Sequence, residues 1–158
     1  MLKIASFIQT SGYCGPAVLK MVMGYYGVNK SEQELAKLVP DIDKKGTTGE
    51  VILKIAKKFG FDGFIKDFAT LDDIKHEITI NRRPPIVDWF SVNDGHYSLA
   101  VALGTKNIYL RDPEYKSLRK LPRNEFFRVW FDFRGDFLKS KNDLIVRRMI
   151  VTYPKNGQ

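Results

Sequence analysis

The chain has 158 residues, of which 44% are hydrophobic and 13% aromatic, and its formal net charge at pH 7 is +8. This length favours a single domain over residues 1–158 that builds its own hydrophobic core. The single cysteine excludes an internal disulfide, and no stretch approaches the ~18 apolar residues of a membrane span or the core of a signal peptide. We therefore expect a cytoplasmic protein with no membrane span.

The positive charge makes nucleic acid the obvious partner to consider. However, the densest basic clusters are only pairs: Lys44-Lys45, Lys57-Lys58, Arg82-Arg83 and Arg147-Arg148. Scattered charge of this kind is typical of a solvated surface. We do not expect nucleic-acid binding to be the main role.

The first predicted element is a buried helix that follows a polar loop, within residues 9–27. Pro16 suits the first turn of a helix, and Gly27 suits the position just past its end. Lys20 is the only charged residue between them. A helix that is apolar on nearly all sides is normally buried, so this one should be central, with Cys14 at its start.

A cysteine at a helix start has chemical potential, because free N–H groups and the helix dipole favour the thiolate, which is the nucleophilic form. The peptide N–H of Cys14 could point at an oxyanion formed beside the sulfur, and the side-chain amide of Gln9 could supply a second donor. The alternative, a small buried cysteine with no role, stays open at this point.

Three further helices are expected in the first half of the chain, each opened by a pattern typical of a capping box. The first begins after Ser31 and runs over 32–39, and a polar loop follows over 41–46. The second is opened by residues 47–50 and ends at Gly60, and the third is opened by residues 70–73 and runs to about residue 80. A short strand over 61–68 lies between these last two.

The second half of the chain changes to the pattern of strands. We expect them at residues 85–90, 96–103, 107–112 and 144–153, with a loop over 91–95 and either a helix or a strand over 123–131. Helices followed by antiparallel strands indicate an α+β fold.

Two residues of the predicted hairpin suggest a second piece of chemistry. If strands 96–103 and 107–112 pair around a turn near Gly104, residues whose numbers sum to about 208 lie opposite each other, with Cβ atoms ~4.5–5.5 Å apart. His96 and Asp112 satisfy that sum. The carboxylate could then orient the imidazole, which would act as a base. Together with Cys14 they form the nucleophile, base and orienter of an activated-nucleophile site.

The order of motifs resembles that of the bacteriocin-processing peptidases, which are papain-like cysteine peptidases. The resemblance covers roughly residues 5–115 and rests on several pieces in order. They are Gln9, Cys14-Gly-Pro-Ala, an apolar helix ending Tyr-Tyr-Gly27, Gly46-Thr-Thr, Lys-Lys-Phe-Gly60-Phe, Gly95-His96-Tyr-Ser and Asp112-Pro113.

The resemblance implies a papain-like fold, with the nucleophile at the start of a central helix packed on a C-terminal antiparallel sheet. It also implies Cys14 as nucleophile, His96 as general base, Asp112 as its orienter and Gln9 as oxyanion donor. The implied substrate is a peptide or protein, with a separate export transporter as a further partner and no cofactor. Two departures are Tyr13, where many members have an acidic residue, and a spacing from Gln9 to Cys14 that is one residue shorter than is common.

Other interpretations remain open. The same thioester chemistry would serve an acyl transferase or transpeptidase, and the fold would also serve a non-catalytic peptide-binding module. Aromatic and basic residues alternate over 119–141, where they could stack on bases, although packing against the sheet is the preferred interpretation. His76 lies in a charged context and is expected at the surface, and no spacing of ligands indicates a metal site.

Overall fold

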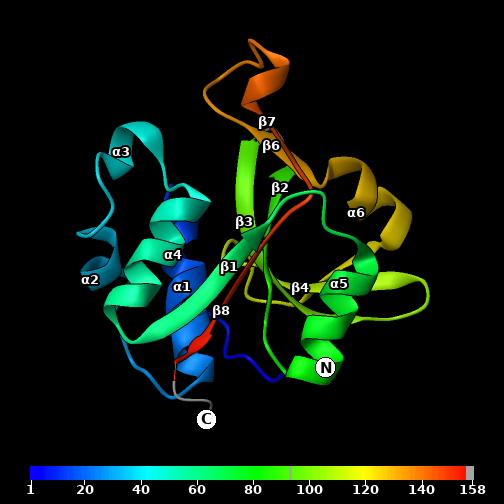
Figure 1. Cartoon of the computed structure of the whole chain (residues 1–158), viewed down its shortest axis with the longest axis horizontal. Helices are drawn as coiled ribbons and strands as arrows, with labels where there is room; N and C mark the ends of the chain where they lie inside the picture. The colour runs from blue at the N-terminus through cyan, green and yellow to red at the C-terminus, as the bar shows by residue number, and fades with distance from the viewer. Residues whose placement is uncertain (93, 156–158) are drawn as a thin grey trace.

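A six-stranded antiparallel sheet runs through the centre of the protein (Figure 1). The structure is a computed structural model that describes residues 1–92 and 94–155, so that Asn93 of the expected 91–95 loop and residues 156–158 of the expected domain lie outside the described residues. In spatial order the strands are β1 (Phe61–Lys66), β8 (Arg148–Pro154), β2 (Ile86–Ser91), β3 (Asp94–Leu103), β4 (Asn107–Arg111) and β5 (Arg119–Pro122).

Helices lie on both sides of this sheet (Figure 1). One side carries α1 (Cys14–Tyr25), α2 (Glu32–Ala36), α3 (Ile42–Lys45) and α4 (Gly49–Lys58). The other carries α5 (Leu71–His76), which continues into a π-helical turn at Glu77–Asn81, and α6 (Arg123–Val129). A two-stranded arm of β6 (Phe131–Phe133) and β7 (Leu144–Val146), with a 3₁₀ turn at Lys141–Asp143, packs through β6 against β2 and β3. The expected α+β architecture is confirmed.

The central helix α1 is buried as its composition predicts. Eight of its residues, from Gly15 to Met23, are buried, and the helix packs against β3 and α4. Gly27 follows the helix with φ 81°, a conformation that glycine adopts at little cost. The helix begins at Cys14, as expected, and Pro16 is its third residue, within the first turn. The cysteine is therefore part of the first helical turn.

Local capping signals account for three of the six α-helix starts in the described residues, those of α2, α4 and α5. Ser31 and Thr70 both make the expected capping boxes, with Glu34 and Asp73 respectively. The cap of α4 is Thr48, whose hydroxyl accepts from Val51 N–H, one residue later than the start of the expected pattern. Ser, Thr and Asp side chains stop a helix from fraying by satisfying its free N–H groups, which is a local effect that sequence alone reveals.

Two expected elements differ from the structure. The loop expected over 41–46 contains the short helix α3, which follows Asp41 in a left-handed conformation with φ 52°. The single strand expected over 144–153 is divided into β7 and β8, because Arg147 has φ 47° and cannot continue an extended strand. This break lets β7 join the arm while β8 enters the main sheet.

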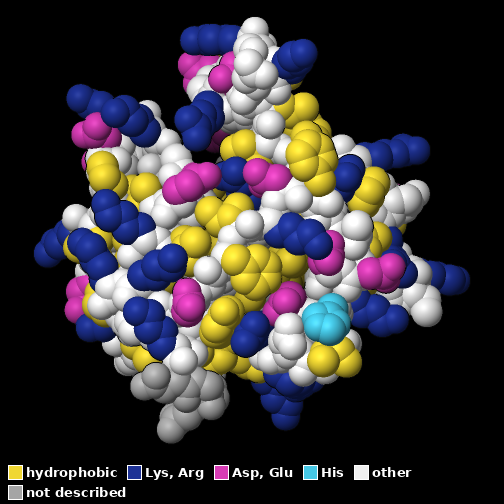
Figure 2. Space-filling view, viewed as in Figure 1, with side chains coloured by type: hydrophobic (Ala, Val, Ile, Leu, Met, Phe, Trp, Pro, Cys, Tyr) yellow, Lys and Arg dark blue, Asp and Glu magenta, His cyan; other side chains and the backbone are white. Residues whose placement is uncertain are grey.

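Four of the six aromatic residues in the segment that follows β5 are buried or stack on another ring, whereas Phe127 and Phe137 are exposed. Phe126 and Trp130 are buried, and the rings of Phe131 and Phe133 stack on Phe90 of β2. Lys and Arg side chains are spread over the face shown in Figure 2 rather than gathered in one stripe. The packing interpretation of residues 119–141 is therefore the better one. Within residues 1–92 and 94–155, no helix has both the length and the apolar character that crossing a bilayer requires.

Candidate active site

Cys14 lies where the buried helix α1 emerges from a surface loop, and its side chain is partly exposed. The loop turns tightly before the helix, because Tyr13 N–H donates to Thr10 O at 2.9 Å and Gly12 has φ 79°. The sulfur therefore lies at the boundary between the core and the surface. This is the position that a nucleophile needs, since it must be held rigidly and still be reached by a substrate.

His96 and Asp112 are joined by a buried hydrogen bond of 2.7 Å between Nε2 and Oδ1. His96 is 5% exposed and Asp112 is fully buried. His96 belongs to β3, and Asp112 directly follows β4. The sequence therefore predicted correctly that these two side chains meet.

The register of the hairpin differs from the one expected. Leu99 pairs with Arg111, so residues of this pair sum to 210 rather than about 208. His96 and Asp112 are thus diagonal neighbours and not directly opposite. They still share a face of the sheet because the difference is two residues, and side chains alternate with a period of two.

The imidazole of His96 is also near Cys14, which contributes to the raised pKa of His96. Burial lowers the pKa of His96, but hydrogen bonds to Asp112 and Cys14 and the charges of both groups raise it to about 10. Burial raises the pKa of Asp112, and its bonds to His96, Glu114 N–H and Arg119 outweigh that effect and lower it. Because Nε2 is engaged by Asp112, Nδ1 is the nitrogen left to face the sulfur. The raised pKa of His96 favours its imidazolium form.

Gln9 precedes this site in the loop, and its backbone is tied to the segment that carries Asp112. Its N–H donates to Pro113 O at 2.9 Å. The amide oxygen Oε1 is buried without a hydrogen-bond partner. The amide nitrogen Nε2 is not buried and unpartnered in this way. The amide is thus oriented with its oxygen inward, which suits a side chain that offers N–H groups.

Glu32 fixes the same loop and was not identified from the sequence. This buried residue of α2 accepts a hydrogen bond from Thr10 N–H at 2.9 Å and another from the Thr10 hydroxyl at 2.6 Å. The carboxylate thereby ties the loop between Gln9 and Cys14 to α2. A glutamate in the first turn of a helix is so common that its sequence position alone carries no such signal.

Arg119 is a second residue that sequence reasoning did not identify. Its Nη1 donates to Asp112 Oδ2 at 2.8 Å and to Ser91 Oγ at 3.0 Å. Residues 119–122 form β5, which pairs with β4. The sequence contains no strand pattern there, so only the folded chain reveals that this arginine reaches Asp112.

A pair of buried carboxyl groups lies beside the strand that carries His96. Asp88 of β2 is 1% exposed, and burial together with the neighbouring charge of Asp132 raises its pKa well above the ordinary range. Burial raises the pKa of Asp132 as well. The Asp132 carboxylate also occupies the space that a Cβ on Gly95 would need. Burial and the charge of Asp132 therefore favour the protonated form of Asp88.

Donor atoms for a metal come together in one group among residues 1–92 and 94–155. His96, Asp112 and Glu114 offer ligand atoms within 4.8 Å of one another. Glu114 is exposed, and the donors of the other two residues are already hydrogen-bonded to each other at 2.7 Å. A cation would therefore have to displace the proton that holds the His96–Asp112 pair together, so the geometry suits proton transfer better than metal binding.

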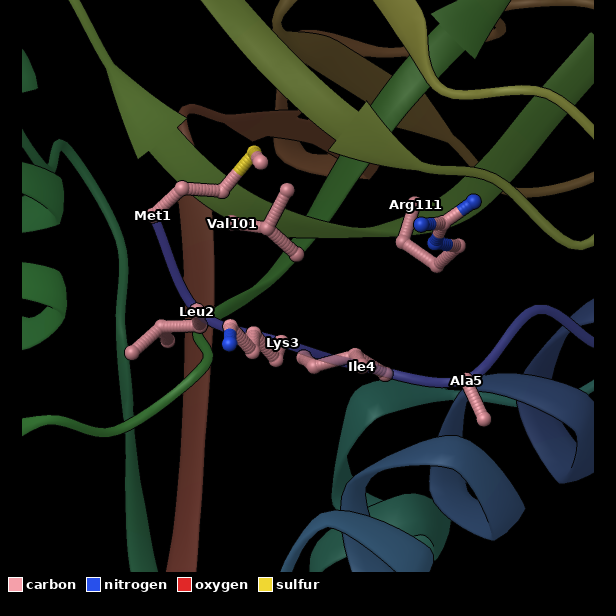
Figure 3. Close-up of a pocket in the computed structure, with 7 residues that line it drawn as sticks. All are labelled: Met1, Leu2, Lys3, Ile4, Ala5, Val101 and Arg111. Atoms are coloured by element: carbon pink, nitrogen blue, oxygen red, sulfur yellow. The ribbon is translucent and has the colours of Figure 1, made fainter.

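Two shallow hollows are present on the described surface. One of about 390 Å³ is lined by residues of α2 and α3 and by Tyr13, which directly precedes Cys14. The other, of about 340 Å³, is shown in Figure 3 and lies between Met1–Ala5, Val101 and Arg111. There the N-terminal segment is held to β3 by a bond from Leu2 N–H to Val101 O. Only the first hollow adjoins the nucleophile directly in sequence.

Comparisons with known proteins agree on one family. Residues 6–133 match the model of the peptidase C39 family. An uncharacterized protein of Methanothermobacter marburgensis is 32% identical over 131 residues, which cover 82% of this chain and 83% of that protein. The transport/processing ATP-binding protein ComA of Streptococcus pneumoniae is 32% identical over 127 residues, which cover 74% of this chain and only 16% of ComA.

Solved structures agree with the fold. A double glycine motif protease from an AMS/PCAT transporter, solved in complex with the leader peptide, has a TM-score of 0.73 at 22% identity, covering 98% of this chain and 94% of that one. The peptidase domain of Streptococcus ComA has a TM-score of 0.70 at 21% identity, covering 98% and 100%. The fold is therefore that of a papain-like peptidase, and the chain belongs to the peptidase C39 family.

Proposed function

We propose that the chain cleaves peptide bonds with Cys14 as nucleophile, His96 as general acid and base, Asp112 as the residue that orients His96, and Gln9 as an oxyanion donor. The observation that carries this proposal is the buried 2.7 Å hydrogen bond between His96 and Asp112, with Cys14 near enough to the imidazole to contribute to its raised pKa. Nucleophile, base and orienter in hydrogen-bond contact are the structural signature of covalent catalysis.

The reaction begins with attack of the Cys14 thiolate on a peptide carbonyl carbon. The carbonyl oxygen becomes an oxyanion, which the Gln9 amide and the Cys14 N–H stabilise by hydrogen bonds. His96, protonated because its pKa is about 10, gives its proton to the leaving amine, and a thioester remains on Cys14. His96 then takes a proton from water, whose oxygen attacks the thioester and releases the acid and the sulfur.

The proposed substrate is a peptide or a peptide segment of a larger protein. It is supported by family membership and by the structural likeness to a double glycine motif protease solved with its leader peptide. Leader-peptide processing, with a separate export transporter as partner, is the narrower form of the proposal. A mixture of a leader-like peptide containing Gly-Gly and a matched peptide containing Ala-Ala, followed by mass spectrometry, measures both cleavage and its position.

Alkylation of Cys14 by iodoacetamide near pH 6 tests the catalytic pair without any substrate. An ordinary thiol has a pKa of about 8.5 and is almost wholly protonated there, whereas a thiolate reacts. We expect the wild type to be labelled at least ~10-fold faster than the His96→Ala variant. His76→Ala is the matched control because His76 is an exposed residue at the end of α5, and its labelling should equal that of the wild type.

Turnover provides the second part of the test. Cys14→Ala should abolish cleavage while leaving the fold intact, and an added amine should not appear in the products if water is the acceptor. Slow labelling of both the wild type and His96→Ala would contradict the thiolate–imidazolium pair. Rapid labelling with products that carry the added amine would instead assign the chain to the acyl transferases.

A further inference from the structure

We propose that Arg119 is a positioning residue of this active site, which acts through Asp112 and holds it in the orientation that His96 requires. The inference rests on the proposed function, since it assigns Asp112 the role of orienting His96. It adds a residue from β5, a strand that supplies none of the four residues expected from the sequence.

The need for such a residue follows from the burial of Asp112. Its carboxylate is fully buried, and a buried charge is stable only when its oxygens are hydrogen-bonded or paired. Oδ1 accepts from His96 Nε2 at 2.7 Å and from Glu114 N–H at 2.9 Å. Oδ2 accepts from Arg119 Nη1 at 2.8 Å. Without that arginine, Oδ2 would lose the donor and the positive charge that it faces.

Arg119 is itself held in a fixed position. Its guanidinium lies 4.9 Å from the ring centre of Trp89 and 4.7 Å from that of Tyr115, and its Nη1 also donates to Ser91 Oγ at 3.0 Å. Its side chain is 19% exposed. Stacking between two rings suits the planar guanidinium far better than it suits the compact ammonium of lysine.

The same contacts connect Arg119 to the imidazole. Arg119 lies over the face of the Trp89 ring. The same Trp89 ring lies edge-on to the imidazole of His96, with ring centres 6.3 Å apart. Trp89 pairs with His96 across β2 and β3, and Arg119 pairs with Leu110 across β4 and β5. Three neighbouring strand pairings thus set the relative positions of arginine, carboxylate and imidazole, and none of them is a flexible loop contact.

A positioning role predicts a loss of turnover without a loss of binding. In Arg119→Gln, kcat should fall about 10- to 100-fold, the range for losing a hydrogen bond to a charged group, while KM changes by less than about twofold. Arg119→Lys should recover part of the loss, since an ammonium can still donate to Oδ2. Lys120→Gln is the matched control, because it removes one positive charge from the same strand at an exposed residue.

The pH dependence separates this role from a purely structural one. Loss of the arginine removes one of the interactions that hold the pKa of Asp112 low, so the acidic limb of the alkylation rate against pH should move to higher pH. Lys120→Gln should leave the limb in place. If Arg119→Gln is poorly folded, Ser91→Ala provides a milder change, because it removes only the hydroxyl that accepts the second hydrogen bond of Arg119 Nη1. Ser91→Ala should also move the acidic limb of the alkylation rate to higher pH.

A double-mutant cycle on the alkylation rate completes the test. Because Arg119 acts through Asp112, Arg119→Gln should slow alkylation in the wild type but have almost no effect in the Asp112→Asn background. Equal effects in both backgrounds, or a wild-type rate and pH profile in Arg119→Gln, would overturn the role of Arg119 alone. If the wild type is alkylated slowly, and His96→Ala is alkylated at the same slow rate, both the proposed function and this inference are overturned.

Discussion

The contact between Gly15 at the start of α1 and Thr47 just before α4 should hold Cys14, the proposed nucleophile, in place, and Gly15→Ala tests this prediction. A Cβ added at Gly15 would lie 2.5 Å from Thr47 Cβ and 2.7 Å from both Thr47 Cγ2 and Oγ1, whereas ordinary contact begins near 3.4 Å. The backbone beside Cys14 and the segment of Thr47 must therefore move apart by about 0.9 Å, the difference between 3.4 and 2.5 Å. Overpacking of this kind costs about 1–3 kcal/mol, which lowers Tm by about 2–12 °C for a domain of this size.

The displacement should affect activity more than stability. A misplacement of about 1 Å at a reacting group can cost ~100-fold in rate, so we expect kcat to fall by about that factor while most of the protein stays folded at 25 °C. Thermal unfolding followed by circular dichroism measures the first effect, and peptide cleavage measures the second. Gly24→Ala in the same helix is the matched control, because no atom lies within 4 Å of its added Cβ, and it should stabilise the helix by roughly 0.5–1 kcal/mol.

A second substitution distinguishes the clash from a general intolerance of change at Gly15. The three atoms nearest to the added Cβ all belong to the side chain of Thr47, so Thr47→Gly removes them together. The double variant should recover most of the lost activity, less the roughly 0.5–1 kcal/mol that an added glycine costs in stability. A Gly15→Ala variant with wild-type activity and Tm, or a double variant no better than the single one, would refute this account of how Cys14 is held.

Two further outcomes follow from the surroundings of the site. Glu32→Ala removes the two carboxylate oxygens that accept hydrogen bonds from Thr10, so it should lower the free energy of unfolding by about 1–3 kcal/mol. It should also reduce kcat/KM while Cys14 is still alkylated at the wild-type rate. If the alkylation rate falls as much as kcat/KM does, the effect lies on the thiolate instead. Because the pKa of Asp88 is raised in the folded state, the fold binds its proton more tightly than the unfolded chain does, and this contribution to stability is lost as pH rises above the ordinary range of a carboxyl group. Asp88→Asn should therefore gain stability relative to the wild type as the pH rises above about 4 in urea unfolding, and identical pH dependences would contradict the raised pKa of Asp88.

Features set by neighbouring residues were predictable from the sequence. The caps at Ser31 and Thr70 depend on side chains three residues apart, and the burial of α1 depends on its uninterrupted apolar composition. The position of Cys14 at a helix start follows from the same local patterns. The break in the strand at Arg147 was not predictable, because nothing in its neighbours requires a left-handed residue in a β-branched run. The break accompanies the pairing of β7 with β6, which is distant in the sequence.

The meeting of His96 and Asp112 shows why an inexact register was sufficient. The ladder between β3 and β4 shifts by one residue between Ala100 and Ala102, so its pairs sum to 211 near the turn and 210 farther away. A hairpin numbered from its turn alone cannot include such a bulge. The error at His96 was two residues, which preserves the face on which a side chain lies, whereas an error of one would have placed the acid and the imidazole on opposite faces.

The same reasoning explains why Arg119 could not be found from the sequence. Its link to Asp112 requires a third strand, and residues 119–122, Arg-Lys-Leu-Pro, contain neither alternation nor β-branched residues that would predict one. The strand forms because β4 offers it an unpaired edge, a condition that exists only after the hairpin has formed. The proposed nucleophile and base therefore lie in local motifs, whereas the proposed positioning residue depends on tertiary structure, and substitutions in β5 should alter catalysis without altering any motif on which the resemblance rests.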